Sequence, residues 1–113
     1  MSVSQEVSMD GKKVSINISG RFDYKVSQDF RDSYRHVPGQ DGVSYHIDLS
    51  DADYMDSSAL GMLLLLREHA KCHEGAVFLE CPSKQIDSIL KVANFEQLFT
   101  INYINTFPDE IAK

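Results

Sequence analysis

The chain has 113 residues, of which 11 are basic and 17 acidic, giving a formal net charge of -6 at pH 7. This length predicts one compact domain spanning residues 1–113. The negative charge opposes the counterion release that drives most binding to nucleic acids, and it also opposes adsorption to anionic membranes. The chain has no basic leader and no apolar run near ~20 residues, so we expect a cytoplasmic protein with Cys72 and Cys81 as reduced thiols.

The first third of the chain predicts a β-hairpin followed by a helix. Residues 3–9 have a weak strand pattern, and residues 14–19 alternate strictly between aliphatic and polar side chains. Asp10-Gly11 between them predicts a tight two-residue turn. A helix is expected near residues 26–37, ended by Pro38-Gly39. Its apolar face consists of Val26, Phe30, Tyr34 and Val37.

The rest of the chain alternates strands with helices. Predicted strands cover residues 44–49, 76–79 and 98–104, and predicted helices cover residues 57–73 and 83–93. The element order is approximately ββαβαβαβ. This order predicts an α/β fold with a mixed, mostly parallel β-sheet flanked by helices.

The predicted helix at residues 57–73 has apolar residues on two sides. One side is a core face made of Ala59, Met62, Leu63, Leu66 and Ala70. The other side carries Ser57, Gly61, Leu64, Leu65, Glu68 and Cys72. Glycine costs about 1 kcal/mol inside a helix but allows another backbone to approach closely. Two interpretations stay open: a partner docks on this side, or another part of the same domain covers Leu64 and Leu65.

Three possible capping residues, Asp56-Ser57-Ser58, stand at the start of this helix. One of them is enough to cap the helix, so a serine hydroxyl can remain exposed. A phosphate there would add about -1.5 to -2 charges beside Asp51, Asp53 and Asp56. The helix dipole favours an anion at this end by about 0.3–1 kcal/mol. We therefore predict that phosphorylation changes recognition and leaves the fold intact.

The chain resembles the STAS domain family, which includes bacterial anti-sigma factor antagonists. The resemblance rests on residues 56–61 (Asp-Ser-Ser-Ala-Leu-Gly) after a strand, Gly20-Arg21-Phe22-Asp23 and Leu98-Phe99-Thr100-Ile101. It implies a STAS-like fold and a cycle in which an ATP-dependent serine kinase, often the anti-sigma factor itself, modifies Ser57. Ser58 is the second candidate. A PP2C-type phosphatase would reverse the modification, and only the unmodified form would bind its partner.

Together these observations predict a non-enzymatic, phosphorylation-switched regulatory protein, monomeric when free, that needs no cofactor or metal. Its output pathway, through a sigma factor and transcription or through another programme, stays open. The alternative is a structural STAS subunit of a lipid-transport or other membrane-transporter complex, in which Ser57 is only a helix cap and its motif serves packing. The expected partner-binding residues are Asp23, Met55, Asp56, Ser57, Ser58, Gly61, Leu64 and Leu65.

Three other interpretations fit the sequence poorly. Asp51-Ala52-Asp53 is similar to the nucleophile loop of haloacid-dehalogenase-type phosphatases, but the chain is too short for their further catalytic groups. A calcium loop beginning at Asp51 would need glycine where Asp56 stands. His69 and His73 are four residues apart, a spacing compatible with a metal, but no third ligand is tied to them by local spacing.

Overall fold

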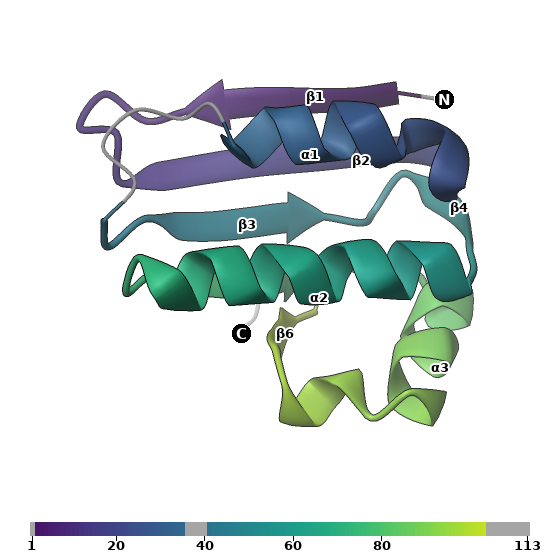
Figure 1. Cartoon of the computed structure of the whole chain (residues 1–113). Coiled ribbons are helices and arrows are strands. Elements are labelled where there is room, and N and C mark those ends of the chain that lie inside the picture. Colours follow the sequence, from purple (N-terminus) through teal and green to yellow (C-terminus); the bar gives the residue numbers. More distant parts are fainter. Residues whose placement is uncertain (1, 36–40, 104–113) are drawn as a thin grey trace, which may run out of the picture.

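The computed structural model describes residues 2–35 and 41–103 (Figure 1). The elements follow the order ββαββαβαβ, with two short 3-10 helices. The strands are β1 (Ser2–Val7), β2 (Lys13–Phe22), β3 (Ser44–Asp48), β4 (Ala52–Met55), β5 (Ala76–Glu80) and β6 (Thr100–Asn102). The helices are η1 (Tyr24–Val26), α1 (Ser27–Arg35), α2 (Ser57–Cys72), α3 (Lys84–Val92) and η2 (Phe95–Gln97).

The sheet is mixed and mostly parallel, as the sequence predicts. Its strand order is β1-β2-β3-β5-β6, and β4 pairs with β2 away from this path. Among the strand pairs of residues 2–35 and 41–103, only β1–β2 is antiparallel. Helices α1 and α2 lie over the same face of the sheet, and α3 lies near β4 and the start of α2 (Figure 1).

The core lies between this face and the helices. In β2, Val14, Ile16 and Ile18 are fully buried while the residues between them are half-buried, which confirms the predicted alternation. All five predicted core residues of α2 are buried as well. Among the described residues, no helix is both long and apolar enough to cross a lipid bilayer.

Strand β4 is absent from the sequence-based prediction, which has no element between the strand at residues 44–49 and the helix at residues 57–73. The strand runs parallel to β2, with Arg21 opposite Tyr54 and Phe22 opposite Met55. The Asp-Ala-Asp sequence is unfavourable for a strand, and four residues are too few to show a period. Pairing with the end of β2 therefore decides the conformation of this segment.

The hairpin turn is where the sequence predicts it, but its predicted length of two residues is wrong. The Ser8 N–H donates to the Lys13 carbonyl at 2.8 Å, so four residues form the loop. The Asp10 carboxylate accepts hydrogen bonds from the Ser8 hydroxyl and the Lys12 N–H. Gly11 follows with a φ of 73°, a conformation that glycine adopts readily.

Several predicted boundaries shift. Val26 belongs to η1, and the predicted helix end at Val37 lies outside the described residues. The last strand is limited to Thr100–Asn102 because the Phe99 N–H donates to the Phe95 carbonyl, which keeps Phe99 in the preceding turn. Ile104, its predicted end, also lies outside the described residues.

The turn after α2 uses its glycine for space. Glu74 takes the left-handed conformation, with a φ of 57°, where the sequence suggests Gly75. A Cβ on Gly75 would stand 2.4 Å from the Val43 carbonyl oxygen. Gly75 is therefore required by the close approach of the Val43 backbone.

Candidate functional site

The candidate site is at the end of the sheet where β2 and β4 finish side by side. Phe22 and Met55 are register partners at the ends of two parallel strands. Asp23 and Asp56, the next residues, therefore follow neighbouring strand ends. The Asp23 carboxylate accepts from the Lys25 N–H at 3.0 Å and caps η1. Its side chain is buried, so Asp23 supports this edge from inside.

Asp56 is the residue that caps α2. Its Oδ1 atom accepts from the N–H groups of Ser58 and Ala59 at 3.1 and 3.2 Å, and from the Ser58 hydroxyl at 2.6 Å. The Ser58 hydroxyl, followed by the backbone N–H groups, lowers the pKa of Asp56. The carboxylate therefore remains charged at neutral pH and holds the first turn of the helix.

The two serines have different environments because Asp56 takes the cap. Ser58 is half-buried and its hydroxyl is bound to Asp56. Ser57 is the first residue of α2 and is exposed, and no group within residues 2–35 and 41–103 hydrogen-bonds to its hydroxyl. Of the two, Ser57 is the hydroxyl open to a modifying enzyme.

The outer side of α2 is open. Leu64 is 38% exposed and Leu65 60% exposed, so the described part of the chain leaves both leucines accessible. A Cβ on Gly61 would have no atom within 4 Å. Two of the predicted binding residues are buried instead: Asp23 is 5% exposed, and Met55 is 4% exposed and packs in the core. The reason is that β4 is a strand whose pleat directs Met55 inward.

An apolar hollow that the sequence does not predict lies next to this surface. It has a volume of about 290 Å³ and lies between the first turn of α2 and α3. Its lining consists of Leu60, Ser88, Ile89, Val92 and Ala93. Val92 lies outside the core stripe of α3 and is 85% exposed, which is unusual for an apolar side chain. An exposed valine on a helix that already has a complete core stripe was the available signal.

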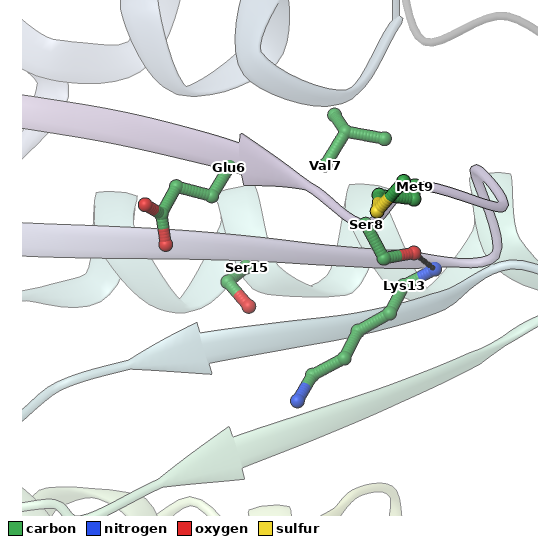
Figure 2. Close-up of a pocket in the computed structure, with 6 residues that line it drawn as sticks. All are labelled: Glu6, Val7, Ser8, Met9, Lys13 and Ser15. Atoms are coloured by element: carbon green, nitrogen blue, oxygen red, sulfur yellow. Dashed lines mark hydrogen bonds between the residues drawn. The ribbon is translucent and has the colours of Figure 1, made fainter.

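A larger hollow, of about 400 Å³, lies at the other end of the sheet beside the β1–β2 hairpin (Figure 2). It is lined by Glu6, Val7, Ser8, Met9, Lys13 and Ser15. The Lys13 N–H donates to the Ser8 hydroxyl at 3.0 Å and closes the hairpin. None of these residues belongs to the predicted site. The volume of a hollow therefore does not indicate where the candidate functional site lies.

The histidine pair on α2 is part of an aromatic cluster. The rings of His69 and His73 are 4.9 Å apart, and the His69 ring lies 5.0 Å from that of Tyr34. Nδ1 of His73 lies 3.0 Å from the His69 carbonyl oxygen. Within the described ranges, no three potential metal ligands converge.

Comparison with known proteins agrees with this architecture. A family model described as "Mlab, STAS domain" matches residues 6–101. A STAS-domain containing protein of Pseudomonas aeruginosa (strain UCBPP-PA14) is 46% identical over 102 residues, covering 90% of this chain and all of that protein. The chain therefore belongs to the STAS domain family.

Solved structures show the same fold at low sequence identity. A candidate anti-sigma factor antagonist from Thermotoga maritima superposes with a TM-score of 0.76 at 16% identity, over 92% of this chain and 88% of that one. The anti-sigma factor antagonist SpoIIAA in its unphosphorylated form gives 0.67 at 17% identity, over 98% and 94%. A sulfate transporter family protein from Wolinella succinogenes gives 0.69 at 15% identity, over 88% and 82%.

Proposed function

We propose that this protein is a non-enzymatic regulatory binding protein whose partner binding is switched by reversible phosphorylation of Ser57. The observation that carries the proposal is that Asp56, and not a serine, caps the start of α2. Asp56 caps the helix and binds the Ser58 hydroxyl, which leaves the Ser57 hydroxyl exposed beside Gly61 and Leu64.

The chemistry of the switch follows from this position. A kinase would transfer the γ-phosphoryl group of ATP to the Ser57 oxygen, releasing ADP, and a phosphatase would hydrolyse the ester. The phosphate would be tolerated because the helix dipole favours an anion at the first turn. The cap does not involve the Ser57 side chain, so the fold is retained.

The effect on binding would be large. The partner surface is the apolar outer side of α2, formed by Gly61, Leu64 and Leu65, and extended through Leu60 to the hollow on α3. Burying a dianion against such a surface costs several kcal/mol unless the partner supplies compensating charge. Phosphorylation would therefore lower the occupancy of the complex by orders of magnitude.

The expected partners are an anti-sigma-factor-type serine kinase and a PP2C-type phosphatase. Two structural relatives are an anti-sigma factor antagonist and a candidate for that role. Such a cycle consumes ATP, and the proposal accordingly places the protein in the cytoplasm.

The direct test compares Ser57→Ala and Ser57→Glu variants, each tagged and expressed in the native cells. Quantitative mass spectrometry should recover a partner with the wild type and Ser57→Ala, and about tenfold less of it with Ser57→Glu. Ser4→Glu, an exposed serine of β1, is the matched control and should bind normally. Equal recovery with Ser57→Glu would contradict the switch, provided that all variants melt within a few degrees of each other.

The second candidate function is a structural subunit of a membrane-transporter complex. The fold likeness to the sulfate transporter family protein favours it. In that role Ser57 would not be a switch; the sequence suggests Ser57 as a helix cap there, whereas Asp56 caps α2 in the structure. Stable co-purification with a transporter ATPase, unchanged by Ser57→Glu, would support this candidate over the first.

A further inference from the structure

Arg21 is a cation held next to the candidate site by contacts that it can release. It lies near the end of β2, opposite Tyr54 of β4. Its guanidinium carbon is 3.7 Å from the centre of the Tyr54 ring, and its Nε is 3.3 Å from Oδ2 of Asp23. The Arg21 side chain is nevertheless 59% exposed, so it can rotate without disturbing the core.

Tyr54 connects this arginine to the start of α2. Tyr54 lies one residue before Met55, the end of β4, and its hydroxyl helps to lower the pKa of the Asp56 carboxyl group, after larger contributions from Ser58 and Ala59. Asp56 caps the helix whose first residue is Ser57. Arg21 thus contacts Tyr54, which stands three residues before Ser57 along the chain.

The charges around Ser57 are otherwise mostly negative. Asp51 and Asp53 are exposed, and Asp56 lies immediately before the serine. A phosphate on Ser57 would be repelled by these carboxylates and would attract an exposed guanidinium at the same end of the sheet, such as that of Arg21. Arginine suits this role because its planar fork of N–H donors binds two phosphate oxygens at once.

We propose that Arg21 is the residue that responds to phosphorylation of Ser57, moving its guanidinium from Tyr54 and Asp23 to the phosphate. This rests on the function proposed above and names the regulation of the same site. The movement uncovers the Tyr54 ring and removes the ionic partner of Asp23, which still caps η1. Phosphorylation is thereby transmitted from α2 to the end of β2 and the turn before α1.

The test uses protein in which phosphoserine is incorporated at position 57 during translation, so it needs neither kinase nor partner. The second ionisation of the phosphate is followed by ³¹P NMR during a pH titration. An arginine bound to the phosphate favours its dianion, so the pKa of the phosphate should be lower in the wild type than in Arg21→Gln. We expect a difference of about half a unit, or threefold in proton affinity.

Two further variants make the result specific. Lys25→Gln removes another exposed cation, from η1, and should change the phosphate pKa much less than Arg21→Gln. Arg21→Lys keeps the charge but not the fork, and should give an intermediate value. A phosphate pKa in Arg21→Gln equal to that of the wild type would overturn the proposal, as would an equal effect of Lys25→Gln.

The result of this titration can be distinguished from success or failure of the proposed phosphorylation switch. If Ser57 is never phosphorylated in cells, the switch fails even though the titration can still show pairing. If the titration shows no pairing while phosphorylation still abolishes partner binding, the switch stands and the role of Arg21 fails.

Discussion

The carboxylate of Asp56 and the hydroxyl of Ser58 are hydrogen-bonded at 2.6 Å, which commits both residues to the cap of α2. Replacing Asp56 by alanine should cost about 0.5–2 kcal/mol of stability, because the N–H groups of Ser58 and Ala59 lose their acceptor. Urea unfolding at pH 7 measures this. Ser57→Ala is the matched control and should change stability by only a few tenths of a kcal/mol.

The same cap predicts a pH dependence. Because the pKa of Asp56 in the folded protein lies below its ordinary value of 3.8, the charged cap stabilises the fold above that pH. This contribution is lost as the pH falls through the folded-state pKa. Asp56→Asn should therefore lose less stability between pH 5 and pH 2.5, roughly the range of this titration, than the wild type. Parallel pH profiles for the two proteins would contradict this account.

Two glycines, Gly61 within α2 and Gly75 in the turn after it, should respond in opposite ways to alanine. Gly61→Ala has free space around its Cβ and should stabilise the helix by about 0.4–1 kcal/mol. Gly75→Ala would push a methyl group into the Val43 carbonyl and should destabilise the protein. Thermal unfolding distinguishes these effects. If Gly61 is a point of close approach for the partner, Gly61→Ala should also weaken binding without any loss of stability.

The two sides of α2 provide a second matched comparison. Leu65→Lys places a charge on an open surface and should change stability by less than about 0.5 kcal/mol while abolishing partner binding. Leu63→Ala removes a fully buried side chain and should cost about 2–5 kcal/mol. Normal partner recovery with Leu65→Lys would remove this face of α2 from the proposed surface.

The lowered pKa of His69 predicts that the folded protein loses stability in mild acid. Burial, and then the nearby charges of His73 and Arg35, lower the pKa of His69 below its ordinary value of 6.5. The unfolded chain therefore binds a proton more readily than the folded protein, and stability falls as the pH drops below about 6.5. Histidine titration by NMR should give a His69 pKa below 6.5, and His73→Gln should raise it. A value above 6.5 would contradict the packing described.

The sequence predicts the elements whose periodicity is expressed in their own residues. The alternation of Val14, Ile16 and Ile18 marks β2, and the core face of α2 is correct at all five positions. β4 could not be predicted in this way, because its four residues become a strand only through pairing with the end of β2. The inward position of Met55 was missed for the same reason.

The candidate site is partly predictable for a similar reason. Local sequence identifies a helix start at Asp56-Ser57-Ser58, but three residues of comparable capping ability leave open which one caps. The choice depends on the position of the Asp56 carboxylate between the Tyr54 hydroxyl and the first turn of α2. The contact between Arg21 and Tyr54 also depends on the register of β2 against β4, which local sequence does not contain.

The most direct test of the central claim is phosphopeptide and intact-mass analysis of the protein from its native cells, with and without treatment by a PP2C-type phosphatase. The account predicts an adduct of about 80 Da at Ser57 that the phosphatase removes. An unmodified Ser57 under all growth conditions, or an adduct on Ser58 alone, would contradict it.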